Sequence, residues 1–169
     1  RYEQAAGKRF RIEERSFFQI NVPQAERLVE IVQRFCGDEN PGLVVDGFGG
    51  VGLFSLGVFG PDTEIHLYDL SRSAVKDSRH NARELGFRSF SPHVFDAAGV
   101  QNAIGYADTL ILDPPRAGLG EEAATASAAL GANTVVYISC NPATLARDLQ
   151  QFAAAGYVIE RVVPVDMFP

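Results

Sequence analysis

Hydrophobic and polar positions change period several times along the chain. After Pro23, apolar side chains at Leu28, Val32 and Phe35 recur at helical spacing, and they predict an amphipathic helix that ends at Gly37. Beyond Gly37, short apolar runs alternate with helical stretches. The expected strands are residues 43–48, 64–69, 90–95, 109–113, 134–139 and 157–165. The expected helices between them are residues 51–59, 73–85, 121–130 and 142–154.

This alternation predicts an α/β fold with a mostly parallel sheet and helices on both faces. Continuous apolar strands that are separated by helices are typical of such sheets, because both faces are covered. Ligands then bind beyond the carboxyl ends of the strands. The informative positions are those that follow each strand, namely residues 46–52, Asp69, Asp96, residues 113–116 and residues 140–142.

Composition and charge narrow the class of protein. With 169 residues, 46% of them hydrophobic and 21% charged, the chain fits one globular domain. No apolar run is long enough to span a membrane, and no signal peptide opens the chain, so we expect a cytoplasmic protein without membrane contacts. The net charge is −6, but residues 1–15 hold five basic and three acidic side chains. The acidic remainder is a poor binder of nucleic acid by itself.

A glycine-rich turn follows the first strand of the predicted sheet. Residues 47–52 satisfy the pattern G-x-G-x-x-G, in which glycines such as Gly50 and Gly52 let the backbone approach a ligand closely. Asp69, at the end of the next strand, is placed to accept hydrogen bonds from ribose hydroxyls. The combination serves NAD and S-adenosyl-L-methionine alike. The structural alternative is a plain tight turn beside a solvated carboxylate.

Two further turns carry reactive side chains. The sequence Asp-Pro-Pro-Arg at residues 113–116 fixes the Asp113 carboxylate at the predicted crevice, because two prolines stop the strand from continuing. Cys140 leaves the next strand beside a helix that Pro142 opens, where a thiolate is favoured. Its position leaves a core residue and a nucleophile equally open. Cys36 lies on the apolar face of its helix and is expected to be a core residue. Neither the cysteines nor the histidines have the spacing of a metal site, so no metal is expected.

With these residues located, the chain resembles the catalytic domain of the S-adenosylmethionine-dependent RNA uracil-5-methyltransferases. The likeness runs from about Ser16 to Pro169, and its most specific parts are the turns around Asp113 and Cys140. The matching segments are residues 17–21, 46–52, Asp69 with Asn81, residues 113–119, 137–149 and 166–169. The last segment and the Ala-Arg-Asp-Leu run at residues 146–149 are more similar to the ribosomal-RNA members than to the bacterial tRNA members.

The resemblance implies roles for individual residues. Cys140 corresponds to the nucleophile, and Asp113 belongs to the catalytic site as well as to the cofactor contacts. The positions that correspond to cofactor contacts are Gln19, Asp46, Phe48, Gly50, Gly52, Asp69 and Asp113, with Asp96 near the adenine. The implied cofactor is S-adenosyl-L-methionine. The implied partner is RNA, ribosomal RNA rather than tRNA, bound mainly by domains that this sequence does not contain.

The chain departs from the family pattern at three places. Leu53 stands where a cofactor-contacting Asn is common, and Gly49 stands where a Cys is frequent, which we expect to be harmless. The proton-abstracting Glu of the family lies just beyond Pro169, in a final strand that we expect to be missing. We therefore expect residues 1–20 to be a lead-in from a missing N-terminal region, and residues 21–169 to be a catalytic domain truncated at its C-terminus, poor at turnover by itself.

Other functions remain open at this point. A tRNA uracil-5-methyltransferase has the same motifs and differs only in its substrate. The glycine-rich turn also suits an NAD-dependent oxidoreductase. A third possibility is a domain that binds the cofactor or a protein partner without catalysis.

Overall fold

The computed structural model describes residues 1–37, 41–94 and 105–167. Its strands are β1 (Tyr2–Ala5), β2 (Lys8–Arg11), β3 (Leu43–Gly47), β4 (Glu64–Asp69), β5 (Phe90–Val94), β6 (Thr109–Leu112) and β7 (Thr134–Tyr137). Its helices are α1 (Val22–Cys36), α2 (Leu53–Val58), α3 (Arg72–Glu84), α5 (Gly120–Ala128) and α6 (Pro142–Ala154). The bounds of β4 and α6 are those expected from the sequence.

Five strands form one parallel sheet in the order β5-β4-β3-β6-β7. The chain starts in the middle at β3, moves outward to β5, and then returns to the other side of β3 at β6. This reversal places the crevice for a ligand at the carboxyl ends of β3 and β6. The α/β fold expected from the sequence is confirmed.

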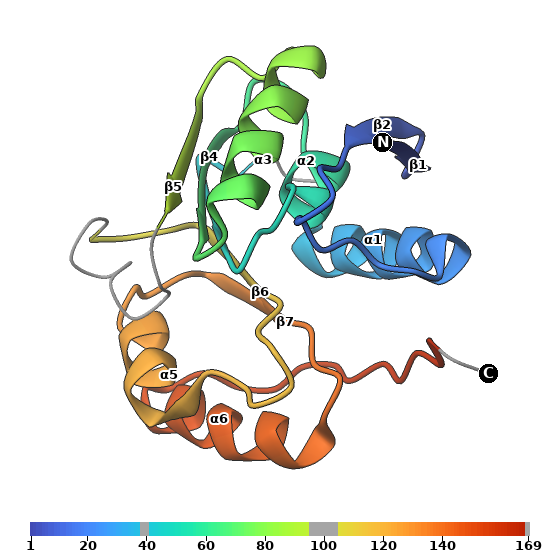
Figure 1. Ribbon diagram of the computed structural model, residues 1–169. Coiled ribbons are helices and arrows are strands. Elements are labelled where there is room, and N and C mark those ends of the chain that lie inside the picture. The colour runs from blue at the N-terminus through green and yellow to red at the C-terminus, as the bar shows by residue number, and fades with distance from the viewer. Residues whose placement is uncertain (38–40, 95–104, 168–169) are drawn as a thin grey trace.

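Helices cover both faces of the sheet (Figure 1), with α1, α2 and α3 on one side and α5 and α6 on the other. Two apolar clusters fill the two layers, and neighbouring residues of β3 belong to different ones. Val44 packs in the cluster with α1 and α2, whereas Val45 packs with α5 and α6. Because side chains alternate along a strand, Asp46 lies on the same face as Val44.

An antiparallel hairpin of β1 and β2 precedes the sheet, a feature that the sequence pattern did not predict. Its two-residue turn has positive φ at Ala6 (53°) and Gly7 (67°), the geometry that tight hairpins favour. Ala5 and Phe10 are fully buried in the first cluster. The hairpin is therefore packed on the domain as part of its core.

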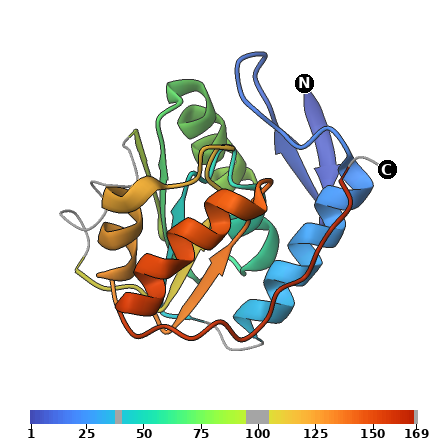
Figure 2. The same cartoon turned by 90° about the horizontal axis from the view of Figure 1, so that it is seen from below.

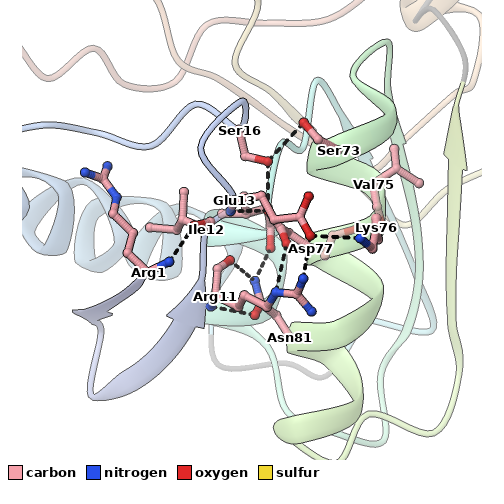
Figure 3. A network of polar contacts seen from close by, with 12 residues as sticks. Arg1, Arg11, Ile12, Glu13, Ser16, Ser73, Val75, Lys76, Asp77 and Asn81 are labelled. Atoms are coloured by element: carbon pink, nitrogen blue, oxygen red, sulfur yellow. Dashed lines mark hydrogen bonds and ion pairs between the residues drawn. The ribbon is translucent and has the colours of Figure 1, made fainter.

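Polar contacts join the segment after the hairpin to α3 (Figure 3). The buried Asp77 carboxylate accepts hydrogen bonds from the Glu13 amide at 2.6 Å and the Ser16 hydroxyl at 2.7 Å. It also pairs with Nε of Arg11 at 3.4 Å. The Asn81 side chain accepts from the Arg11 amide at 2.7 Å and donates to the carbonyl oxygens of Arg11 and Val51. These bonds fix the segment that leads to residue 19.

Lys8, beside the hairpin turn, binds the C-terminal end of α2, the helix that follows the glycine-rich turn. The Lys8 ammonium donates to the carbonyl oxygens of Leu56, Gly57 and Phe59, where α2 ends. A cation is favourable there because the last carbonyls of a helix have no partner within the helix. Partial burial lowers the pKa of Lys8.

The strand expected at residues 157–165 is not formed. The segment leaves the end of α6 and then runs alongside α1 (Figure 2), and the Asn21 side chain donates to the carbonyl oxygen of Met167 at 3.0 Å. Val158 is 83% and Val162 70% exposed. The β-branched residues favour an extended backbone, but a strand needs a partner, and the described part of the chain supplies none here. Within the described residues, no helix combines the length and apolarity needed to cross a bilayer.

Candidate active site

The glycine-rich turn is fastened to the end of β4. The amides of Phe48 and Gly49 both donate to the carbonyl oxygen of Tyr68, at 2.8 and 3.0 Å. Phe48 (72°), Gly50 (55°) and Gly52 (90°) all have positive φ. Positive φ is uncommon at a non-glycine residue such as Phe48, and strained backbone of this kind concentrates at ligand sites.

A glycine is needed at position 49 because neighbouring side chains leave no space for a Cβ atom, and not because of its φ angle. A Cβ atom at this position would lie 2.5 Å from Cγ of Leu67 and 2.8 Å from Cγ of Asp46. Leu67 fills the space that a side chain would need. The Leu67 side chain therefore packs where a Cys side chain, frequent in the family at this position, would lie.

Asp69 is oriented by backbone amides on both sides. One carboxylate oxygen accepts from the Gly50 amide at 2.9 Å, and the other accepts from the Ser71 amide at 2.7 Å. The carboxylate thus ties the glycine-rich turn to the start of α3. Each oxygen keeps a further lone pair for a hydroxyl donor.

Asp46 is the most unusual side chain of this edge. It is fully buried, and neither carboxylate oxygen has a hydrogen-bond partner. Burial raises the pKa of Asp46 to about 6, the nearby Ser55 hydroxyl and amide lower it in part, and the charge of Asp69 raises it. A buried polar group without a partner calls for an explanation, and a bound ligand is one.

Asp113 directly follows β6 and lies beside Asp46. Residue 112 pairs with Gly47 on one side and with Tyr137 on the other, so the ends of β3, β6 and β7 are adjacent. Burial raises the pKa of Asp113 to about 7, and the charge of Asp46 raises it further. The carboxyl group can therefore gain or lose a proton near neutral pH.

Cys140 is exposed in the turn between β7 and α6, whereas Cys36 is packed in the first apolar cluster and burial raises its pKa to about 12. The turn is rigid. The Asn141 side chain accepts from the Ala143 amide at 3.0 Å and caps α6, and the Ser139 hydroxyl accepts from the Asn141 amide at 3.1 Å. Cys36 is only partly buried and packs against the edge of the apolar core, whereas Cys140 is exposed and is not a core residue.

The Asp113 turn and the Cys140 turn are bonded to each other. The carbonyl oxygen of Arg116 accepts from the Asn141 amide group at 3.5 Å and from the Thr144 hydroxyl at 3.3 Å. Two segments that are some 25 residues apart in sequence therefore meet at one edge of the sheet.

Two expected cofactor contacts, Gln19 and Asp96, and one departure from the family pattern, Leu53, remain to be placed. Gln19 is half-buried between the buried Phe18 and Ile20, which is 85% exposed. Leu53, which replaces a common Asn, packs in the first apolar cluster and offers no polar contact. Asp96 lies outside the described residues.

Sequence reasoning missed Ser55, because a serine inside an apolar helix gives no signal of its own. The buried Asp148 of α6 was not predicted either, because the motif around it gives this residue no role.

Among the residues that the structure describes, no group of His, Cys, Asp and Glu side chains could hold a metal ion.

Comparisons with known proteins agree with this geometry. A family model described as tRNA (Uracil-5-)-methyltransferase matches residues 98–169. The uncharacterized RNA methyltransferase YljE of Lactococcus lactis is 33% identical over 96% of this chain and 36% of its own length. The uncharacterized RNA methyltransferase GSU1452 of Geobacter sulfurreducens is 38% identical over 99% of this chain and 34% of its own length.

A solved structure has the same fold over nearly the whole chain. The tRNA (uracil-54, C5)-methyltransferase of Pyrococcus abyssi, in complex with S-adenosyl-L-homocysteine, superposes with a TM-score of 0.85 at 30% identity. The match covers 99% of this chain and 41% of that one. The chain thus spans about a third of the length of the curated relatives named above.

Proposed function

Since the chain belongs to the RNA uracil-5-methyltransferase family, we propose that it forms the catalytic centre of an enzyme that methylates C5 of a uridine in RNA. The methyl group comes from S-adenosyl-L-methionine. The observation that carries the proposal is the hydrogen-bonded junction of two turns, one with the exposed Cys140 thiol and one with Asp113.

The residues at this edge fit the cofactor. Asp46 supplies a buried carboxylate without a partner, and a Cβ atom at Gly50 would meet nothing within 4 Å, so there is room above the turn. Asp69 has lone pairs for the ribose hydroxyls. Phe48 and Gly52 shape the turn, Gln19, Asp96 and Asp113 complete the proposed contacts, and the cofactor would supply an electrophilic methyl group when bound.

Cys140 acts as the nucleophile. Its thiolate adds to C6 of the uracil ring, which gives C5 the character of an enolate carbon and makes it reactive towards the methyl group. After transfer, a base removes the C5 proton, the bond between sulfur and C6 breaks, and the thiolate is restored. Asp113 holds or accepts a proton beside the reacting ring, because its pKa lies near 7. The target base has to leave its stack to reach the thiol.

We propose ribosomal RNA as the substrate in preference to tRNA. The Ala-Arg-Asp-Leu run at residues 146–149 and the segment 166–169 support this choice. The Pyrococcus relative, which acts on tRNA, favours the alternative. Residues 16–169 carry ten basic and eighteen acidic side chains, so we place most of the phosphate contacts on other protein segments.

A covalent adduct tests the proposed nucleophile. With S-adenosyl-L-methionine present, RNA with 5-fluorouridine at the target traps the methylated Cys adduct, because after methyl transfer C5 carries fluorine in place of the proton that a base would remove. We expect the wild-type protein and the matched control Cys36→Ala to form the adduct with 23S rRNA transcripts, and Cys140→Ala to form none. An adduct that persists in Cys140→Ala, seen by denaturing gel electrophoresis, removes Cys140 from this role. Stronger labelling of tRNA transcripts assigns the substrate to tRNA.

Calorimetry separates the methyltransferase from an oxidoreductase that uses the same glycine-rich turn. We expect S-adenosyl-L-homocysteine to bind and NADH not to bind. Preferential binding of NADH would reject the proposed cofactor.

A further inference from the structure

Asp148, in the second turn of α6, is an interior carboxylate with donors from three directions. It is 1% exposed. Its carboxylate accepts from the Leu119 amide at 2.7 Å, from the Tyr137 hydroxyl at 2.6 Å, and from the Arg147 guanidinium at 2.8 and 3.0 Å. Burial opposes ionisation, but the bonds from Tyr137 and Arg147 outweigh it and lower the pKa of Asp148.

These bonds join the strand and the helix that flank Cys140 to the loop that follows Asp113. Tyr137 ends β7, three residues before Cys140, and Leu119 ends the loop that begins with the Asp-Pro-Pro-Arg turn. The Arg147 guanidinium adds a bond to the carbonyl oxygen of Ala117 at 2.9 Å. The Asp148 carboxylate therefore adds a second, buried connection between the two turns, besides the bonds from Asn141 and Thr144 to the carbonyl oxygen of Arg116.

Gly118 adapts the loop to this contact. Its φ is 75°, and a Cβ atom there would collide with the carboxylate of Asp148 and lie 2.8 Å from the Arg147 guanidinium. The loop backbone therefore lies directly against the charged pair. The close approach leaves the loop little freedom to shift while Asp148 is ionised.

We propose that Asp148 is a positioning residue for methyl transfer: it sets the distance between the Asp113 turn and the Cys140 turn without touching the reacting atoms. This inference rests on the proposed function, because it needs Cys140 and Asp113 to act on one base. Its consequence is that loss of the Asp148 charge slows the chemical step while the glycine-rich turn, on β3 and β4, keeps its affinity for the cofactor.

The chain offers a matched control at the opposite edge of the sheet. Asp108, just before β6, accepts from the Leu43 amide at 2.8 Å and from the Tyr106 hydroxyl at 2.6 Å. This arrangement of one amide and one tyrosine repeats that of Asp148, but it lies at the amino ends of the strands. Loss of a hydrogen bond between an aspartate and a tyrosine affects both sites, whereas a positioning role affects only Asp148. Because Asp108 is half-buried and Asp148 is 1% exposed, the midpoint of unfolding is measured for each variant as well, and rates are compared under conditions in which all variants are folded.

The experiment compares Asp148→Asn and Tyr137→Phe with Asp108→Asn and Tyr106→Phe in the protein. Two quantities are measured for each variant: the rate of adduct formation with saturating 5-fluorouridine 23S rRNA transcript, and the Kd for S-adenosyl-L-homocysteine. We expect the rate to fall about tenfold or more in Asp148→Asn and about threefold in Tyr137→Phe. The rates of both control variants, and all four Kd values, should stay within about twofold of wild type.

An Asp148→Asn rate equal to that of Asp108→Asn overturns the positioning role. If Asp148→Asn does not fold, Tyr137→Phe decides, and an unchanged rate in that variant overturns the proposal equally. Failure of the proposed function is recognised separately, since wild type would then form no adduct, and failure of the proposed nucleophile would leave the adduct in Cys140→Ala.

Discussion

Two kinds of buried aspartate occupy this domain, and they differ in their partners. Asp77 and Asp148 lie on helices and accept hydrogen bonds from backbone amides and hydroxyls, and each pairs with an arginine. Asp46, at the end of β3, is just as buried but has no hydrogen-bond partner, and the pKa values of Asp46 and its neighbour Asp113 are raised. The helix aspartates fasten loops to the domain, whereas Asp46 and Asp113 lie at the carboxyl ends of β3 and β6, where we propose that the cofactor binds.

Burial alone does not tell whether a carboxylate stabilises or destabilises the native state. A buried carboxylate with enough donors stabilises the native state, because its removal leaves those donors unpaired. A buried carboxylate without donors destabilises the native state at neutral pH, and a site for a cationic ligand is one arrangement that retains it. Partner count, and not exposure, separates the two classes.

The largest effect is expected from removal of a partnered aspartate. Asp77→Ala leaves the Glu13 amide without its acceptor and removes one of two partners from the Ser16 hydroxyl, which keeps Ser73, and from Arg11, which keeps the Glu13 carboxylate. A buried partner of Arg11 is lost as well, so the free energy of unfolding should fall by about 3–5 kcal/mol. Urea denaturation measures the loss. The exposed Glu14→Ala is the control and should stay within about 0.5 kcal/mol of wild type. An equal, small effect in both variants would remove the distinction between partnered and unpartnered acids.

The opposite sign is expected at Asp46. Its pKa is about 6 in the folded state and near 3.9 in the unfolded chain, so ionisation destabilises the fold as the pH rises from about 4 to 6. Asp46→Asn should therefore raise the free energy of unfolding by about 2–3 kcal/mol at pH 8, and the gain should shrink as the pH approaches 4. Urea denaturation across this pH range checks it, with the exposed Asp62→Asn as control. A loss of stability at pH 8 contradicts the absence of partners.

A smaller effect is expected at the glycine beside Asp46. Gly49→Ala places Cβ against Leu67 and Asp46, and overpacking of this kind should lower the free energy of unfolding by about 1–2 kcal/mol. Gly60→Ala, where a Cβ atom meets nothing within 4 Å, is the matched control. Thermal unfolding compares the two variants. Equal midpoints would mean that Leu67 moves aside freely.

The smallest effect is expected in the relative affinity for a charged ligand, S-adenosyl-L-methionine, and an uncharged sulfur analogue, S-adenosyl-L-homocysteine. As the pH rises from 6 to 8, Asp46 and Asp113 lose their remaining protons, and the added negative charge attracts a sulfonium but not a thioether. The Kd for S-adenosyl-L-methionine should fall about threefold relative to that for S-adenosyl-L-homocysteine. Calorimetry at both pH values measures the ratio, and a ratio independent of pH would place the sulfur away from these acids.

Much of the fold could be predicted because the central strands are buried on both faces and therefore read as continuous apolar runs. The hairpin was missed because β1 and β2 have only four residues each, are mostly polar, and turn at Ala6 and Gly7 without an Asn or Asp signal. The last expected strand failed for the opposite reason. Residues 157–165 have the composition of a strand, but pairing depends on a neighbour that the local pattern does not contain.

The candidate site divides in the same way. Asp69, Asp113 and Cys140 could be predicted as candidates because Asp69 ends a strand and the other two follow one, and parallel strands bring their carboxyl ends together. The role of Asp148 could not be predicted, because its partners Leu119 and Tyr137 are 29 and 11 residues away along the chain. Asp46 has no hydrogen-bond partner because no donor group in the described part of the fold reaches its carboxylate, and the local sequence does not predict this.

The contact between Lys8 and the end of α2 has a consequence for how this chain can change over evolution. One amine serves the carbonyl oxygens of Leu56, Gly57 and Phe59, although about fifty residues separate them from it in the sequence. The acceptors are backbone carbonyl oxygens, which any residue at positions 56, 57 and 59 supplies, so the contact restricts replacement at position 8 and leaves the helix side chains free to vary. Position 8 therefore tolerates fewer replacements than its polar surroundings suggest.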